Sequence, residues 1–369
     1  MHAARQVSVR RGEIEIPLRA RWFLDASGHA ALLARREGWI EENRDHPISA
    51  VWARWRGLAD WDGLELARRY PGWAGASFAA RGNATNHLAS DGWWAWMIPL
   101  KGGDVSVGVV YDERRVRWPR DGTPGERLKA FLSAHPVGRE ILAPGTWNEG
   151  DVHQRRRLAY SSRVFAGDGF ALLGDASGFL DPLYSPGMDW VAYTVTAATE
   201  LVLAERSGAP IGAAISLHNR RFRRSYTRWF EAVYRDKYDY LGEFDLMRIA
   251  FLFDLGFYFW GVVSRPMKDG AAALREPTFS NPATAPIAWF MRTYNRRLAT
   301  IARCREERGH RGFRNRGERH LVSGFTHQPS STRALFQAGR LWASLELVEG
   351  WRSWRREIPR RTAEDPATA

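Results

Sequence analysis

Several residues suited to ligand binding gather in one stretch, 167–187, with the sequence GDGFALLGDASGFLDPLYSPG. The apolar residues 170–173 predict a short strand that ends at Gly174 and Asp175. Glycine at the end of a strand lets a ligand approach the backbone closely. The carboxylate of Asp175 is suited to accept hydrogen bonds from the hydroxyls of a sugar or polyol. We therefore expect a ligand-binding turn after this strand.

The end of the same stretch predicts the start of a helix. Ser185 is a good N-cap residue and Pro186 is favoured at the first helical position. The free amides of a helix start can bind an anion or a partially negative ring oxygen. Asp181 is either a local base or a turn residue beside Pro182. The alternative for the whole stretch is an ordinary strand–turn–helix with a polar turn.

Two tryptophans form a second candidate. In the run Gly92–Leu100, strand alternation places Trp94, Trp96 and Ile98 on one face. Two neighbouring indoles can wall a pocket or a tunnel that leads from it. The alternative is a sheet that packs aromatic residues into its core, because tryptophan favours strands.

The stretch 167–187 closely resembles the second FAD-binding signature of the flavin monooxygenase, halogenase and geranylgeranyl-reductase superfamily. The resemblance implies FAD as the cofactor, with Asp175 holding the ribityl chain. It also implies that the Pro-Leu-x-Ser-x-Gly loop lies against the isoalloxazine and that the following helix start faces its pyrimidine edge. The cofactor-binding residues implied here are Gly174, Asp175, Ala176, Pro182, Gly187 and Met188.

The segment Trp94-x-Trp96-x-Ile98-Pro99 matches the W-x-W-x-I-P motif of flavin-dependent halogenases. In that family the segment separates the flavin from the organic substrate, so Trp94 and Trp96 are implied catalytic residues. Ser185, in the loop against the isoalloxazine, is the third. Tryptophan halogenases carry a Glu where this chain has Tyr184. That difference argues against free tryptophan as substrate and resembles the forms that act on phenols and pyrroles.

A third match, Asp25-Ala26-Ser27-Gly28, is similar to the family turn near the adenosine and pyrophosphate half of FAD. It implies that Asp25, Ser27 and Gly28 bind the cofactor. The arginine usual after this glycine is His29 here, which puts that contact in doubt.

The chain contains no G-x-G-x-x-G motif, which normally opens members of this family after a first strand. From the resemblance we expect that roughly a hundred or more family residues are missing at the N-terminus. They would include the pyrophosphate loop and, in halogenases, a lysine thought to handle the halogenating species. We therefore expect this chain alone to bind FAD poorly and to be inactive.

The expected fold class is α/β (α+β), an FAD-binding Rossmann-like domain of the aromatic-hydroxylase type that is incomplete at the N-terminus. Residues 1–45 and 161–206 are assigned to this domain. Residues 46–160 are assigned to an antiparallel-sheet substrate domain, with strands at 48–56, 94–99, 105–111 and 152–160. Thr123 and Glu126 predict a capping box for a helix through His135. Residues 207–369 are expected to form a helical C-terminal region.

Charge and composition limit the classes of binding partner expected for this chain. The 369 residues carry a net charge of +13, with arginines concentrated in the last third. This balance fits either a solvated basic face or a surface for nucleic acid or an anionic membrane; no nucleic-acid module is recognisable, so no nucleic-acid partner is expected. The single cysteine, Cys304, excludes an intrachain disulfide. No metal site is expected, and the absence of a signal peptide points to the cytoplasm.

One apolar stretch, 246–263, raises the question of a membrane. It is short and is interrupted by Arg248 and Asp254, which favours a core helix over a transmembrane span. Peripheral contact with a membrane surface stays open as an alternative.

Three functions follow. The first is a halogenase-like, FAD-dependent monooxygenase or halogenase that acts through a flavin hydroperoxide on an aromatic or carrier-bound small molecule. Its reduced flavin would come from NAD(P)H or from a separate flavin reductase. The second is an FAD-dependent isoprenoid reductase of the geranylgeranyl type. The third is a truncated, catalytically inactive remnant or a basic interaction module.

Overall fold

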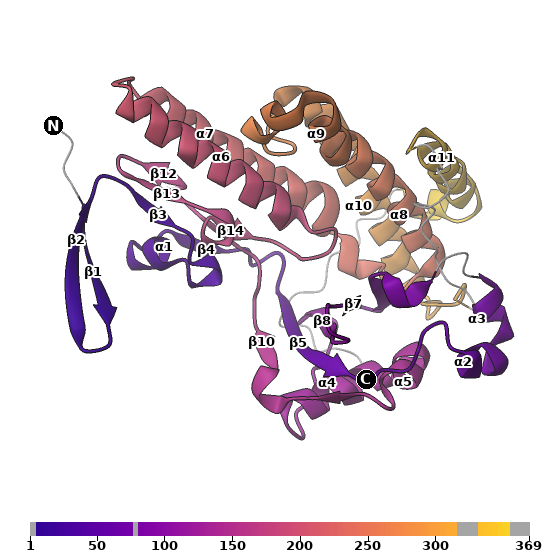
Figure 1. Cartoon of the computed structure of the whole chain (residues 1–369). Helices are drawn as coiled ribbons and strands as arrows, with labels where there is room; N and C mark the ends of the chain where they lie inside the picture. Colours follow the sequence, from indigo (N-terminus) through magenta and orange to yellow (C-terminus); the bar gives the residue numbers. More distant parts are fainter. Residues whose placement is uncertain (1–4, 77–79, 316–330, 355–369) are drawn as a thin grey trace. The chain divides into compact units, whose positions relative to one another are not determined.

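A computed structural model describes residues 5–76, 80–315 and 331–354. The chain mixes helices with short sheets, which confirms the expected α/β class. It forms two compact units, which are described separately here (Figure 1). Unit 1 contains residues 1–44, 159–232 and 257–290, and unit 2 contains residues 45–158, 233–256 and 291–369. Residues 207–369, expected as one helical region, thus contribute to both units.

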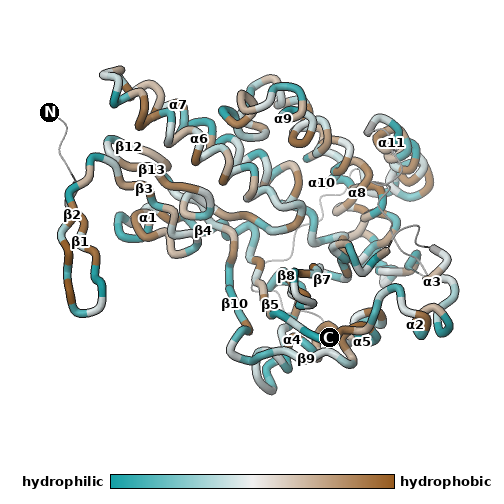
Figure 2. Tube along the Cα trace, in the orientation of Figure 1, coloured by the Kyte–Doolittle hydropathy of each residue, from teal (hydrophilic) through white to brown (hydrophobic). Residues whose placement is uncertain are grey.

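Unit 1 begins with an isolated hairpin and continues with two three-stranded sheets. Its strands are β1 (Arg5–Arg11), β2 (Ile14–Ala20), β3 (Phe23–Asp25), β4 (Ile40–Glu42), β11 (Tyr160–Ser162), β12 (Ala166–Gly167), β13 (Phe170–Leu172) and β14 (Gly178–Phe179). Its helices are α1 (Leu32–Arg36), α6 (Pro186–Arg206), α7 (Gly212–Trp229) and α9 (Ser264–Asp269). The sequence also predicts a strand pair at residues 6–10 and 13–18, which is the β1–β2 hairpin. Figure 2 shows apolar positions along it, and Val9, Ile14, Ile16 and Leu18 are exposed.

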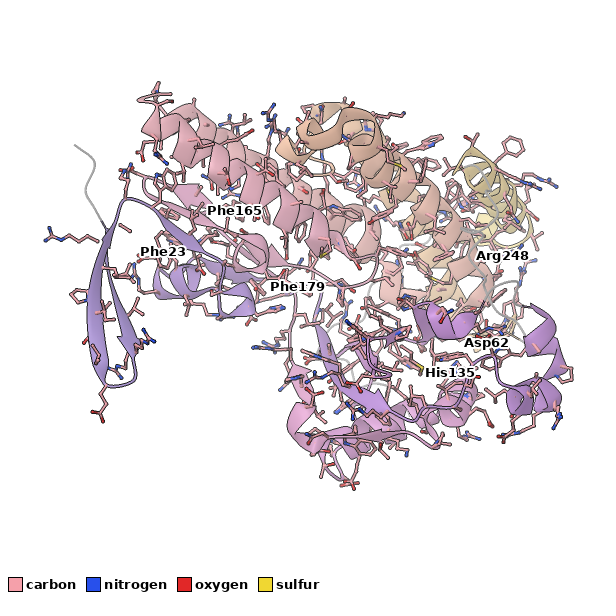
Figure 3. All side chains as sticks on the ribbon, viewed as in Figure 1. Phe23, Asp62, His135, Phe165, Phe179 and Arg248 are labelled. Atoms are coloured by element: carbon pink, nitrogen blue, oxygen red, sulfur yellow. The ribbon has the colours of Figure 1, made fainter. Side chains whose placement is uncertain are left out.

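The sheet β12-β13-β3 positions the candidate ligand loop. Strand β13 pairs in parallel with β3, and Phe170 lies opposite Phe23, which Figure 3 labels. One face of the sheet packs on α1 through Leu33 and Ala34, and the other packs on α6 through Ala198 and Leu201. A parallel strand covered on both faces must be apolar along its whole length. That requirement explains why all three residues of β13 are buried.

Unit 2 is built on a six-stranded antiparallel sheet. Its main strands are β5 (Ile48–Arg56), β6 (Asn86–Ser90), β7 (Trp93–Pro99), β8 (Val105–Asp112) and β10 (His153–Arg155), in the order β10-β5-β8-β7-β6, with β9 (Thr146–Trp147) beside β5. The turn between β7 and β8 has Gly102 and Gly103 at positive φ. These glycines allow the tight connection that the sequence predicted.

One face of this sheet carries the core of unit 2. Trp93, Ala95 and Met97 of β7 pack there with residues of β5 and β8 and with Leu128 and Ile141 of two covering helices. The helices that lie wholly in this unit are α2 (Leu64–Arg69), α3 (Pro71–Ala76), α4 (Pro124–Ser133), α5 (Pro136–Leu142) and α11 (Ser331–Val348). Helices α8 (Phe244–Tyr258) and α10 (Ala285–Glu307) have residues in both units.

Several predicted boundaries are confirmed and others are wrong. The capping box of Thr123 and Glu126 is present, but α4 ends at Ser133 because Pro136 begins a separate helix. The strand predicted over 152–160 is interrupted, since Arg157 has a φ of 50° and cannot continue an extended strand. The sequence also predicts a loop over 309–331 and a disordered tail over 362–369. Residues 316–330 of the loop and the whole of the tail lie outside the described residues.

The apolar stretch around α8 is one helical segment, Phe244–Arg275, which is long and apolar enough to cross a membrane by length and composition alone. The core helix of a soluble protein passes the same test. Within unit 2 its residues Leu246, Ile249 and Phe253 are buried. Asp254 is also buried and accepts a hydrogen bond from the Lys237 ammonium at 2.6 Å. Of the apolar window of this segment, 33% is buried, whereas the core helix of a soluble protein is mostly buried.

Candidate functional site

The predicted ligand loop has the expected local structure. Strand β13 ends at Leu172, a single helical turn covers Gly174–Ala176, and α6 begins at Pro186. Gly174 has a φ of 52°, and a side chain there would come within 2.8 Å of Val191 on α6. Glycine is therefore needed at this position for its backbone conformation and for its close approach to the helix. Ala176 is fully buried and fixes the turn against the sheet.

Asp175 is the polar centre of this loop. Its side chain is one-third exposed, and Oδ2 lies 3.9 Å from Nε2 of His29. Burial raises the pKa of the Asp175 carboxyl, and the nearby His29 opposes that rise. A Cβ built on Gly187 would lie 3.8 Å from Oδ1 of Asp175. The structure thus places Gly187 beside the Asp175 carboxylate, which a ligand can reach.

His29 joins the first and third sequence motifs. Its ring lies 4.6 Å from Phe179 of β14, labelled in Figure 3, and 5.7 Å from Tyr160. The Tyr160 hydroxyl donates to the backbone oxygen of Asp175 at 2.6 Å. Sequence reasoning treated His29 only as a departure from the family pattern and missed Tyr160. No local signal could have found the pair, because His29 and Tyr160 are far apart along the chain.

Asp25 and Ser27 stabilise the turn that precedes α1. The buried Asp25 carboxylate accepts hydrogen bonds from the Ser27 amide at 3.0 Å, the Ser27 hydroxyl at 2.6 Å and the Leu33 amide at 2.8 Å. Ser27 Oγ in turn accepts from the Leu32 amide at 3.0 Å. These bonds hold the turn and the start of α1. Gly28, with a φ of 61° and open space where a side chain would be, is the accessible part of this turn.

The start of α6 differs from the prediction. Ser185 precedes the helix and Pro186 is its first residue, but the Ser185 side chain makes no capping hydrogen bond. Tyr184 and Ser185 have φ values of 65° and 53°, which is the left-handed conformation that rarely suits residues with side chains. N-capping requires an extended Ser185, so this backbone places the hydroxyl elsewhere. Two adjacent residues in this conformation are a strained feature typical of functional loops.

Other loop residues have simple positions. Asp181 is buried, and its Oδ1 accepts from the Leu183 amide at 2.9 Å, which is the geometry of a turn residue. Pro182 is half-buried in the same turn. Met188, in the first turn of α6, is 70% exposed, so its side chain is available to cover a ligand.

The tryptophan pair belongs to unit 2. Trp94 and Trp96 lie on the same face of β7, as predicted, with ring centroids 5.7 Å apart. Trp94 is buried, and its Nε1 donates to the Tyr238 hydroxyl at 2.9 Å. The half-buried Trp96 donates to Ser106 Oγ at 3.0 Å. These bonds give Trp94 a packing role and leave part of the Trp96 indole accessible.

The surroundings of the tryptophan pair are also aromatic. His87 of β6 lies edge-on to Trp94, at 5.4 Å between ring centroids, and burial lowers its pKa. Gly108 of β8 lies under Trp96, because a Cβ there would be 2.2 Å from the indole. The missing side chain at Gly108 therefore lets the Trp96 ring lie flat across the neighbouring strand.

Metal chemistry finds no support in the described part of the chain. Among residues 5–76, 80–315 and 331–354, no group of three His, Cys, Asp or Glu side chains is arranged to hold a metal ion.

The fold is that of the FAD-dependent halogenases. The crystal structure of halogenase PltM superimposes with a TM-score of 0.65 at 18% identity, covering 93% of this chain and 66% of PltM. A PltM structure in complex with phloroglucinol and FAD matches with a TM-score of 0.63. The flavin-dependent halogenase CmlS matches with a TM-score of 0.54 at 21% identity, covering 92% of this chain and 52% of CmlS.

Sequence comparisons support the same family. The family model described as tryptophan halogenase matches residues 74–236. Flavin-dependent halogenase armH1 of Armillaria mellea is 29% identical over 231 residues, which are 58% of this chain and 41% of armH1. Flavin-dependent halogenase chlA of Dictyostelium discoideum is 28% identical over 240 residues, which are 62% of this chain and 38% of chlA. The chain is therefore similar in sequence to flavin-dependent halogenases, and it spans only about two-fifths of the length of these relatives.

Proposed function

We propose that this chain is part of an FAD-dependent halogenase that acts on a small aromatic molecule, and that unit 1 holds the ribityl and isoalloxazine part of the cofactor. The observation that carries the proposal is the accessible Asp175 carboxylate beside Gly187 and the start of α6. Reduced FAD, when bound, supplies the activation of oxygen, and the protein supplies orientation and exclusion of water.

Each residue of the loop has a defined task in this proposal. Asp175 accepts hydrogen bonds from the polyol chain, and His29, 3.9 Å away, opposes the rise that burial causes in the pKa of Asp175. Gly28 and Gly187 leave room for the cofactor to approach the backbone. The amides at the start of α6 face a partially negative ring edge or a halide. In unit 2, the accessible part of the Trp96 indole provides an aromatic surface that the substrate contacts.

The residues present fit one part of FAD and lack another. The carboxylate, the open glycines and the helix start suit a polyol and a flavin ring. No G-x-G-x-x-G loop for the pyrophosphate occurs in the sequence. We therefore propose that this chain by itself binds flavin weakly, with a Kd above about 10 µM, and does not favour FAD over FMN.

A flavin titration tests the cofactor proposal. Fluorescence quenching of FAD and of FMN by the purified chain should give similar, weak affinities, and Asp175→Ala should weaken both about tenfold, as expected for losing a charge-assisted hydrogen bond. Asp181→Ala is the matched control, since Asp181 already serves a turn. Tight stoichiometric FAD binding, or an unchanged affinity in Asp175→Ala, would contradict the proposal.

A product assay tests the reaction. Phloroglucinol, the ligand in the PltM complex, is incubated with the protein from its native host, a flavin reductase, NADH, oxygen and chloride. A chloride-dependent exchange of hydrogen for chlorine, read by mass spectrometry, supports halogenation. Addition of one oxygen without chloride dependence supports hydroxylation instead. Turnover of an isoprenoid without oxygen would favour the reductase alternative.

A further inference from the structure

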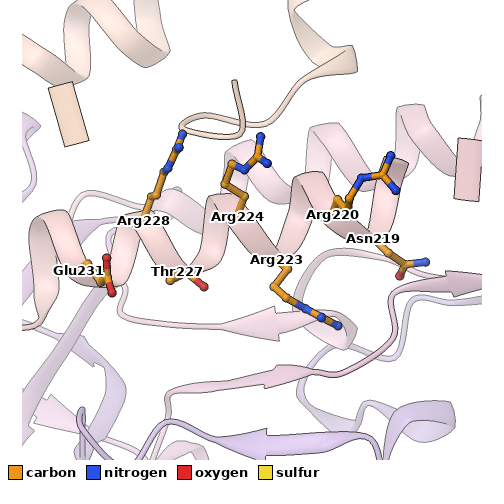
Figure 4. Close-up of a pocket in the computed structure, with 7 residues that line it drawn as sticks. All are labelled: Asn219, Arg220, Arg223, Arg224, Thr227, Arg228 and Glu231. Atoms are coloured by element: carbon orange, nitrogen blue, oxygen red, sulfur yellow. The ribbon is translucent and has the colours of Figure 1, made fainter. Parts of the chain in front are cut away.

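A strongly basic cavity lies on the outer side of α7, within unit 1 and separate from the loop around Asp175. It is a depression open to solvent, has a volume of about 450 Å³, and is lined by residues of α7 and by Glu231, which follows the helix (Figure 4). The lining residues are Asn219, Arg220, Arg223, Arg224, Thr227, Arg228 and Glu231. This volume lies within the range of small-molecule sites.

The arginines occupy one half of the helix surface because of their spacing. Arg223 and Arg224 follow Arg220 by three and four residues, so each is its neighbour on the next turn, and all three are exposed. Figure 4 shows Arg223 on one side of the helix and Arg224 and Arg228 on the other. Guanidinium groups therefore approach the cavity from two sides.

Arg223, Arg224 and Arg228 donate to backbone carbonyl oxygens, and Glu231 offsets part of the charge of Arg228. Arg223 donates to the backbone oxygen of Arg163, and Arg224 donates to that of Ser280 at 3.0 Å. Arg228 donates to the backbone oxygens of Phe279 and Asn281 at 2.8 and 2.9 Å. A carbonyl oxygen fixes a guanidinium in place but does not cancel its charge.

The neighbouring arginine shows the contrast. Arg221, on another face of α7, pairs with the Glu276 carboxylate at 3.2 Å. Burial lowers the pKa of Arg228, the nearby Arg224 lowers it further, and Glu231 opposes this change. Three cations within one helical turn repel one another, and a bound anion would remove that cost.

We propose that the cavity formed by Arg220, Arg223, Arg224 and Thr227 binds a phosphate group that carries at least two negative charges. Guanidinium forks match phosphate oxygens with paired hydrogen bonds, and the Thr227 hydroxyl adds a further donor. Glu231 closes the opposite end near Arg228 and repels an anion from there. The site is independent of the flavin proposal, because none of its residues belongs to the loop around Asp175.

Calorimetric titration of the full chain with inorganic pyrophosphate tests this site. We expect saturable, one-to-one binding that weakens when salt is raised, since exposed charges are screened. The triple variant Arg220→Ala/Arg223→Ala/Arg224→Ala should weaken binding about tenfold or more. The variant Arg220→Lys/Arg223→Lys/Arg224→Lys keeps the charge and loses only the paired hydrogen bonds. Its affinity for pyrophosphate should lie between those of the wild-type chain and the alanine triple.

A matched control removes the same charge elsewhere in unit 1. Arg10→Ala/Arg11→Ala/Arg19→Ala, on the exposed β1–β2 hairpin, should change the affinity less than about twofold, because distant exposed charges are screened. Circular dichroism establishes that each variant is folded. The proposal is overturned if pyrophosphate does not saturate the folded wild-type chain, or if the hairpin triple weakens binding as much as the α7 triple.

Two further arms identify the source of the phosphate. Tighter binding of ADP than of pyrophosphate, lost in the α7 triple, assigns the site to a soluble nucleotide. Co-sedimentation with vesicles containing phosphatidic acid, lost in the same variant but not in the hairpin control, assigns it to a lipid headgroup. Both results retain the phosphate site and differ only in what carries the phosphate.

Discussion

The hydrogen bond between Trp94 and Tyr238 offers a direct test of whether Trp94 is held as part of the core. Both side chains are buried, and the indole Nε1 donates to the tyrosine hydroxyl at 2.9 Å. Trp94→Phe removes the N–H group that donates to the buried Tyr238 hydroxyl and leaves a void beside that hydroxyl. We expect a clear loss of stability rather than a neutral change.

The magnitude follows from two contributions. Replacing an indole with a phenyl ring leaves a void of roughly 40 Å³, which at about 24 cal/mol per Å³, with the lost burial added, costs about 2 kcal/mol. Loss of the hydrogen bond costs about 1 kcal/mol more. Tyr238→Phe should cost about 1 kcal/mol, because it removes the bond with little change in volume. The double variant should cost about 3 kcal/mol, so the coupling energy is about 1 kcal/mol.

Urea unfolding followed by circular dichroism measures these four proteins. Trp96→Phe is the matched control, since it is the same chemical change at the half-buried partner, and it should cost only about 1 kcal/mol. Two results would refute the reasoning: a cost below about 1 kcal/mol for Trp94→Phe, or single-variant costs that add within about 0.5 kcal/mol. Either would mean that the indole is not fixed by Tyr238.

Three further predictions concern buried groups. Lys237→Met leaves the buried Asp254 carboxylate without its cation and should lower the free energy of unfolding by about 3–5 kcal/mol, whereas Lys237→Met/Asp254→Leu should recover most of that loss in the same urea assay. Gly108→Ala has no room beneath Trp96 and should cost about 1–3 kcal/mol with a changed near-ultraviolet circular dichroism signal; an unchanged signal would contradict the packing described. Burial lowers the pKa of His218 to about 4, so the unfolded chain binds more protons than the folded chain below about pH 6.5; stability should therefore fall by about 2 kcal/mol between pH 7 and pH 5, and His218→Leu should reduce this fall if the reasoning holds.

Local patterns predicted much of unit 2. The alternation in residues 48–56 and the glycine turn at 102–103 specified β5 and the β7–β8 hairpin, because strand period and turn chemistry are properties of adjacent residues. The capping box of Thr123 worked for the same reason. The predicted C-terminal end of this helix was wrong, since α4 ends at Ser133 and a second helix begins at Pro136.

The candidate site was predictable only in its parts. The motif around Asp175 identified a ligand loop, but the contact with His29 depends on the pairing of β3 with β13, which no local pattern encodes. The left-handed Tyr184 and Ser185 were missed because both are poor candidates for that conformation by residue type. The expected basic face concerned the arginines of the last third of the chain; the arginines of α7 were not singled out, because their carbonyl contacts are with residues distant in sequence.

The parallel pairing of β3 with β13 also sets an order of events during synthesis. The ladder joins Phe23 to Phe170, so β3 cannot reach this partner until residue 172 has been made. The six-stranded sheet between them uses residues 48–155, a continuous piece of chain joined by neighbouring antiparallel strands. Short-range pairings form faster than distant ones. The sheet of unit 2 can therefore pair before β3 meets β13, and the ligand loop of unit 1 takes its shape only after residues 48–155 have been made.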